Sequence, residues 1–87
     1  MNLTMSHLEN CFEEAKLLGV PYVAVKIEMA GFPEAEIIIN KRKNIDSKLA
    51  YYQKTYDENL NHKFATGIKI IGFIYGDDFG DIQEDLD

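Results

Sequence analysis

The sequence predicts one small α+β domain that runs helix, strand, strand, helix, strand along its 87 residues. Apolar residues recur at helical spacing in 6–18 and 46–59, while 22–29, 35–41 and 66–75 are rich in residues that favour strands. Apolar residues make up 46% of the chain and charged residues 28%, which is typical of a protein that folds. A chain of this size has a thin core, so surface buried by a partner matters to its stability.

The first helix is indicated by residues 6–18. Ser6 and Glu9 have the spacing of a capping box, and Gly19 stands where a left-handed residue commonly follows the last helical turn. The apolar face of this helix consists of Leu8, Cys11, Phe12, Ala15 and Leu18.

The next two segments, 22–29 and 35–41, predict an antiparallel hairpin. The sequence AGFPE at 30–34 has the glycine and proline of a turn, and so short a connection joins antiparallel strands. The first strand alternates, so that one of its faces carries Val23, Val25, Ile27 and Met29.

A second helix and a third strand follow the basic cluster at 41–43. Residues 66–75 are apolar on both faces, which predicts a strand that is either central or covered on both sides. The apolar positions of the second helix, spaced by three or four, are Ile45, Leu49, Tyr52, Tyr56 and Leu60.

We expect residues 1–75 to form a three-stranded mixed sheet in the order 2-1-3, numbered along the chain, with both helices on one face. The connection from the second to the third strand should be right-handed. The helices would cover Val23, Val25, Ile27, Ile37, Ile39, Ile68 and Ile70.

The opposite face of this sheet is then an apolar patch that exceeds scattered surface hydrophobes and should be covered. A second copy of the chain, the last twelve residues or another protein could cover it, and a homodimer is the commonest such arrangement. The residues of this patch are Tyr22, Ala24, Ile38, Ile71, Phe73 and Tyr75.

Residues 76–87 hold six acidic residues and no basic one, and so account for the whole net charge of −6. The spacing of these acids does not fit a calcium-binding EF-hand loop, so we expect solvated charge and no bound metal. With a neutral body, binding to nucleic acid is disfavoured despite the cluster of Lys41, Arg42 and Lys43.

The acidic segment also has an apolar stripe, because Phe79, Ile82 and Leu86 fall at i, i+3 and i+7. A merely solubilising tail has no need of such a stripe, so we expect a short helix that docks on its own domain or on a partner. Asp77, Asp78 and Asp81 would contribute the charged part of that surface.

No constellation of catalytic, cofactor-binding or metal-binding residues is apparent. Cys11, the single cysteine, lies on an apolar helix face, and His7 and His62 stand at separate helix ends. The glycines lack the strand-to-helix placement of a phosphate-binding loop. One cysteine, no signal sequence and no long apolar run lead us to expect a cytoplasmic protein without a membrane span.

The sequence therefore favours a non-catalytic protein-interaction module of the inhibitor or adaptor type. Two alternatives remain: a small-molecule binder or enzyme using Tyr22, Tyr75 or Glu28 between sheet and helices, and a DNA mimic acting through the acidic segment. Eight Lys to one Arg, ten Ile, six Asn and an acidic end give a chain that resembles the short accessory proteins of phages and prophages of low-GC Gram-positive bacteria.

Overall fold

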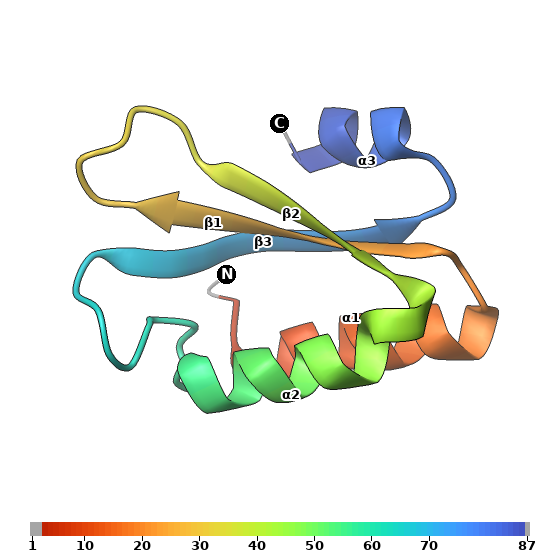
Figure 1. The fold of residues 1–87 in the computed structure, drawn as a ribbon, viewed down its shortest axis with the longest axis horizontal. Coiled ribbons are helices and arrows are strands. Elements are labelled where there is room, and N and C mark those ends of the chain that lie inside the picture. Colours follow the sequence, from red (N-terminus) through yellow and green to blue (C-terminus); the bar gives the residue numbers. More distant parts are fainter. Residues whose placement is uncertain (1–2, 87) are drawn as a thin grey trace.

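The computed structural model describes residues 3–86 and contains a three-stranded sheet between two layers of helix (Figure 1). Along the chain the elements are α1 (Met5–Leu18), β1 (Tyr22–Met29), β2 (Glu36–Lys41), a 3-10 turn (Arg42–Asn44), α2 (Ile45–Thr55), β3 (Ile68–Gly76) and α3 (Phe79–Leu86). The strand order is β2-β1-β3, which confirms the predicted order 2-1-3. Asp87, counted above among the acids, lies outside the described residues.

The sheet is antiparallel throughout, and the expectation of a mixed sheet was wrong. β1 is the central strand and pairs antiparallel with β2 on one side and with β3 on the other. β2 and β3 run in the same direction, but β1 separates them, so no parallel pair forms.

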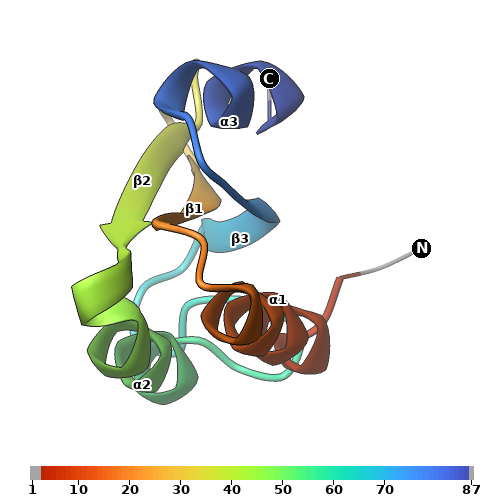
Figure 2. The ribbon, with the colours of Figure 1, turned by 90° about the vertical axis from the view of Figure 1, so that its right-hand side faces the viewer.

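α1 and α2 lie side by side under one face of the sheet, as predicted, and α3 lies on the other face (Figure 2). β3 is therefore covered on both faces although it is an edge strand, because α1 and α3 both pack against it. This explains the two apolar faces of its sequence.

α1 begins one residue before the predicted start and uses a different cap. Thr4, not Ser6, is the capping residue, and its backbone N–H donates to Nδ1 of His7 over 3.0 Å. Gly19 has φ 71° and ends the helix in the left-handed conformation, as predicted.

The core lies between the sheet and the α1/α2 layer. Tyr52 of α2 is fully buried at its centre and meets Phe12 edge to face. Asn40, the buried polar residue of β2, donates to the backbone oxygen of Val23 and to the hydroxyl of Tyr52. The remaining buried members of this core are Leu8, Ala15, Val25, Ile27, Ile45, Tyr56, Leu60 and Ile70.

The predicted placement of Ile38, Phe73 and Tyr75 on the opposite face was wrong, because all three pack against this core. A β-bulge accounts for the two residues of β3. Lys26 and Ile27 are consecutive in β1, but their partners Gly72 and Ile70 are not, and Ile71 is the extra residue. One extra residue moves every later side chain to the other face.

The placement of Ile38 on the core face has a different cause. It pairs with Val25, and residues opposite each other in a pair share a face, so Ile38 lies on the core side with Val25. The hydrophobic run of three isoleucines in β2 does not show which of them faces the helices.

α3 docks on the face of the sheet opposite the core by its apolar stripe. Ile82 is 1% exposed, and the ring of Phe79 stacks on that of Tyr22 with 4.3 Å between centroids. The ammonium of Lys26 donates to the backbone oxygen of Leu86 over 2.6 Å, which places a positive charge at the negative end of the helix.

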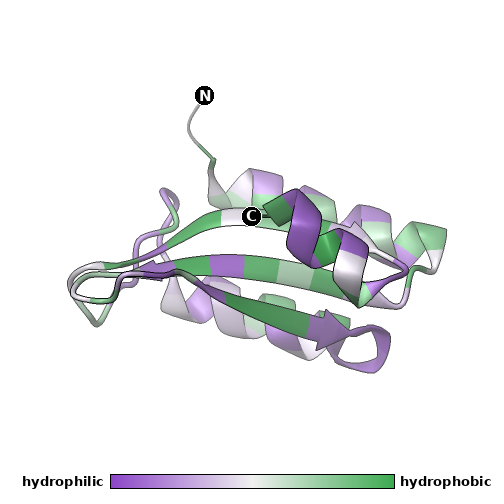
Figure 3. Ribbon diagram, turned by 90° about the horizontal axis from the view of Figure 1, so that it is seen from above, coloured by the Kyte–Doolittle hydropathy of each residue, from purple (hydrophilic) through white to green (hydrophobic). Residues whose placement is uncertain are grey.

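Two glycines of β3 allow this close approach. A Cβ atom at Gly76 would lie 3.1 Å from Cγ1 of Ile82, and one at Gly72 would lie 3.3 Å from Cδ2 of Leu86. Figure 3, viewed from the α3 side, shows largely hydrophobic strands and a helix in which hydrophilic and hydrophobic residues alternate.

We expect Ile82→Ala to lower the free energy of unfolding by about 2–4 kcal/mol, because it leaves a cavity under α3. Urea titration followed by circular dichroism would measure the change. Gln83→Ala, at the exposed neighbouring position, is the matched control and should change stability by less than about 0.5 kcal/mol. Equal stability of the two variants would contradict the docking of α3.

Candidate functional site

The outer edge of β3 is closed over its first part and open over its second. The N–H of His62 donates to the oxygen of Ile68 over 2.9 Å, and the N–H of Ile70 donates to the oxygen of Leu60 over 3.0 Å. Within residues 3–86, no backbone group of another segment bonds to this edge beyond Ile70.

The hydrogen-bond pattern shows which backbone groups are left free. The N–H of Ala30 donates to the oxygen of Gly67 over 2.8 Å, and bonded and non-bonded positions alternate along an antiparallel pair. Counting back from Ala30, every second residue of β1 therefore bonds to β3. The partners of these β1 residues in β3 are Lys69, Gly72, Ile74 and Gly76, since the bulge adds one residue between the first two. The N–H and C=O groups of Phe73 and Tyr75 therefore point away from β1, toward the open edge.

A groove of about 580 Å³ lies beside this open edge, between α1 and β3. Phe73 and Tyr75 form one wall of it, and their side chains are half-buried. The other residues that line it are Leu3, His7, Asn10, Cys11, Glu14 and Ile74. We call the open edge and this groove together the edge groove.

The edge groove has no nucleophile in a reactive state. Burial raises the pKa of the Cys11 thiol to about 11, and the nearby carboxylate of Glu14 adds to the rise. The thiol is thus protonated at neutral pH, and the thiolate is the reactive form. Burial likewise raises the pKa of Tyr56, under the sheet, to about 12.

We expect iodoacetamide to alkylate Cys11 of the folded chain at pH 8 about a hundredfold more slowly than in the chain unfolded by urea, whose thiol has its ordinary pKa near 9.0. Mass spectrometry of timed samples would give both rates. Between pH 9 and 11 the unfolded chain loses this proton and the folded chain keeps it, so stability should fall as pH rises through that window. Similar alkylation rates at pH 8 would contradict the burial of Cys11.

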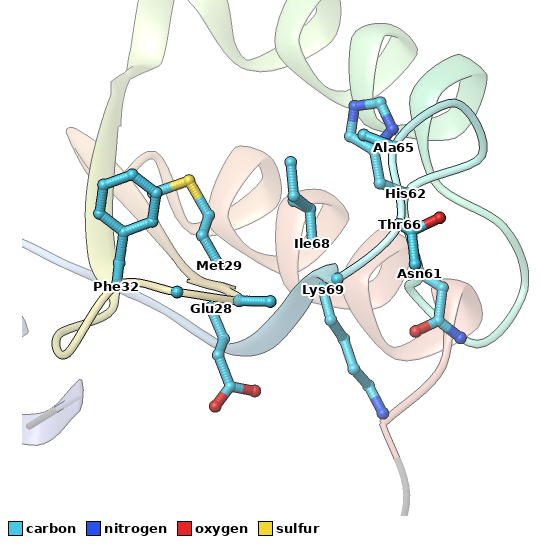
Figure 4. Close-up of a pocket in the computed structure, with 12 residues that line it drawn as sticks. Glu28, Met29, Phe32, Asn61, His62, Ala65, Thr66, Ile68 and Lys69 are labelled. Atoms are coloured by element: carbon cyan, nitrogen blue, oxygen red, sulfur yellow. The ribbon is translucent and has the colours of Figure 1, made fainter.

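A second depression, which we call the loop-end pocket, lies where the β1–β2 turn meets the loop before β3 (Figure 4). Its volume is about 620 Å³. Met29 and Phe32 stand on one side of it, and Asn61, His62 and Thr66 stand on the other. Glu28 and Lys69, partners across β1 and β3, point the same way at its rim.

The acidic residues that the structure describes around α3 are exposed or act in capping. Asp78 is used as a cap, since its Oδ1 accepts from the N–H groups of Gly80 (2.7 Å) and Asp81 (3.2 Å). Over the described part of the chain, no group of three or more His, Cys, Asp or Glu side chains is arranged to hold a metal ion. Asp77, Asp78 and Asp81 are exposed.

The structure separates the residues that the sequence suggested for partner binding. Tyr22, Phe79, Ile82 and Leu86 are used in the contact between α3 and the sheet, so the apolar stripe of residues 76–87 packs on its own domain. Ile38 faces the core, and Ile71 is the bulge residue and is 38% exposed. Only Phe73 and Tyr75 meet at one open site, the edge groove.

The sequence interpretation missed the groove residues of α1 and the exposed side chains of Phe32 and Phe64. Phe32 lies between Gly31 and Pro33 in a turn. Its exposure could have been predicted from this position, since a side chain in a turn commonly faces solvent. Tyr22, Tyr75 and Glu28, suggested for a small-molecule site, belong to three places: the α3 contact, the edge groove and the loop-end pocket.

Comparison of the chain with models of protein families, with curated proteins and with solved structures finds no match. Among residues 3–86, none of the helices has the length and apolar character needed to cross a bilayer.

Proposed function

We propose that this chain is a non-catalytic protein-interaction module, of the inhibitor or adaptor type, that binds an extended protein segment along the edge groove. The observation that carries the proposal is the free backbone of Phe73 and Tyr75 at the edge of β3. In strand addition, main-chain hydrogen bonds supply affinity and alternate side chains of the added segment enter neighbouring pockets. The groove lies where those side chains would enter.

The sequence of β3 supports this use of its edge. An exposed edge strand is normally protected by charged residues or proline, and residues 70–76 contain neither. The edge of β2, by contrast, is flanked by Lys41, Lys43 and Lys48. The open part of the β3 edge lacks such charges and prolines, which favours it as the binding edge.

Tyr75→Pro tests the proposal, because it removes an N–H group that the fold itself does not use. Proline is tolerated at such an edge position, so the variant should fold. Peptides would be selected from a random displayed library on the wild-type chain, and their affinities measured by calorimetry. We expect Tyr75→Pro to weaken the selected peptides about tenfold, the value of one interfacial hydrogen bond.

Tyr75→Val is the matched control, since it loses the same side chain but keeps the N–H group. It should weaken the peptides less than Tyr75→Pro does. Hydrogen exchange should show protection of the amides of Phe73 and Tyr75 when a peptide binds. Peptides that bind both variants equally, or that protect amides elsewhere, would refute strand addition at this edge.

A second function, binding of a small amphipathic molecule, is favoured by the loop-end pocket. Its apolar wall of Met29, Phe32 and Ile68 lies beside the opposite charges of Glu28 and Lys69, and about 620 Å³ is enough for a small ligand. The acidic outer side of α3 could also mimic DNA, but Asp78 is engaged in capping and no contact of this structure favours that use.

Fragments that carry an aromatic ring and a charged group would be screened by NMR for shifts at Met29 and His62. Phe32→Ala should weaken any such binding about tenfold, because one aromatic contact is lost. Phe64→Ala is the control, because Phe64 is 79% exposed and does not line the pocket. An equal effect of both variants would count against a site in this pocket.

A further inference from the structure

We infer that the chain binds an anion with two linked phosphate groups, in a pocket at the β2 edge of the sheet, opposite the edge groove (Figure 2). This pocket, which we call the basic pocket, has a volume of about 360 Å³. It lies between the end of β2 and the start of α2. The residues that the inference uses in its lining are Ile39, Asn40, Lys41, Lys43, Asn44 and Lys48.

The charge that lines the basic pocket is of one sign. Three lysines line it, and no carboxylate of residues 3–86 does. Asp46 is the one acidic residue in the segment 37–56. Both oxygens of its carboxylate accept from Nζ of Lys16 in α1, over 3.0 and 3.2 Å. The chain therefore uses its nearest negative charge elsewhere, and the basic pocket is left for an anion from outside.

The other cations of this region are directed to α1 and not to the basic pocket. Lys16 forms the ion pair with Asp46. The guanidinium of Arg42 lies beside the end of α1, because a Cβ atom at Gly19 would be 3.8 Å from its Nη2 atom. A positive charge there meets the negative end of the helix. Lys16 and Arg42 thus have contacts in the fold, which separates them from the three lysines of the basic pocket.

One ammonium group is held beside the pocket before any ligand binds. Nζ of Lys48 lies over the rings of Tyr51 and Tyr52, at 5.0 and 5.7 Å from their centroids. Cation–π attraction of this kind restrains a lysine side chain. The hydroxyl of Tyr52 in turn accepts from the side chain of Asn40 over 3.4 Å. A restrained lysine has less conformational entropy to lose when an anion binds.

Two uncharged donors add to the three ammonium groups. Ala24, the partner of Ile39, is one of the residues of β1 that bond to β3, so the N–H of Ile39 points outward from the sheet. Within residues 3–86, no backbone group of another segment accepts from it. Asn44 precedes α2, but its side chain makes no capping hydrogen bond, so its amide is available to a ligand.

This set of donors fits a diphosphate better than a carboxylate. A carboxylate has one charge, whereas two linked phosphate groups carry about three charges at neutral pH, which matches three lysines. Lysine binds phosphate as a point charge, and backbone and amide N–H groups donate to the same oxygens. A volume of about 360 Å³ stands at the small end of the range for ligand pockets, as suits an anion of this size.

Titration of the whole chain with sodium pyrophosphate tests the inference. Calorimetry at about 0.05 M salt would give the dissociation constant, and NMR would give the amides that shift. We expect shifts at Ile39, Lys41 and Asn44, and none at Phe73 or Tyr75 of the edge groove. Raising the salt concentration should weaken binding, since exposed charges are screened.

Lys43→Gln should weaken pyrophosphate about tenfold, because one hydrogen bond between charged groups is lost. Lys43 is exposed, so the variant should fold. Lys43→Arg keeps the charge and should bind as the wild type does. Lys54→Gln is the matched control, since it removes the same charge from an exposed position of α2 outside the pocket.

ADP distinguishes two sources of the same diphosphate. Equal affinity for ADP and pyrophosphate would assign the site to the phosphate groups alone. Tighter binding of ADP, with shifts at Tyr51 beside Lys48, would assign it to a nucleotide. Both results support the inference.

Three results would overturn the inference: no binding of pyrophosphate, an equal loss in Lys43→Gln and Lys54→Gln, or sulfate binding as tightly as pyrophosphate. In each case the lysines only protect the β2 edge from strand addition. Single-stranded DNA that shifts these amides when pyrophosphate does not would also overturn it. Peptide binding at the edge groove does not use these lysines, so the proposed function stands or fails separately.

Discussion

The packing of Ile82 against the outer face of β1 and β3 determines which surfaces of this protein are left for other molecules. The sheet has apolar residues on both faces, and α1 and α2 cover only one of them. Without α3, the rings and methyl groups around Ala24 would face water. With α3 in place, β1 and β3 are covered on this face as well. The contact of α3 within the chain thus decides that the apolar stripe of this helix is not available to another molecule.

Two details of β3 make that contact geometrically feasible. Gly72 and Gly76 let α3 approach closely, and the bulge at Ile71 turns Phe73 and Tyr75 toward α1 and Ile74 toward the α3 side. The strand thereby supplies apolar side chains to two layers. Within residues 3–86, the outer backbone groups of Phe73 and Tyr75 have no backbone partner. The side chains of these two residues pack in the fold, and their free backbone groups serve the proposed binding.

Much of the fold could be predicted from the sequence, because helical spacing, alternation and turn residues are local signals. β1 was predicted with its observed bounds, and the glycine that ends α1 was identified. The faces of β2 and β3 could not be predicted, because Ile37, Ile38 and Ile39 are equally apolar and because a bulge leaves no pattern in a run such as IKIIGFIY. That bulge alone misplaced two of the expected binding residues.

The candidate site was harder to predict, since an unpaired edge is a property of the whole sheet. The predicted order 2-1-3 already makes the third strand an edge. The side-chain pattern of that strand does not show which backbone groups, such as those of Phe73 and Tyr75, lack partners. The apolar stripe of residues 76–87 was recognised, but the sequence alone left open whether it packs on its own domain, on a second copy or on another protein. A short helix can dock wherever an apolar surface has a matching shape, and the sequence of the helix does not indicate which surface that is.

The difference between the two edges of the sheet bears on how far association can proceed. Lysines flank the β2 edge, whereas the open part of the β3 edge, beyond Ile70, has no charged residue up to Gly76. A molecule whose open β3 edge is occupied by a partner segment would present only the lysine-flanked edge to another strand. Addition of a strand at the sheet would thus stop after one partner segment, because the lysines beside β2 disfavour a second addition at the opposite edge.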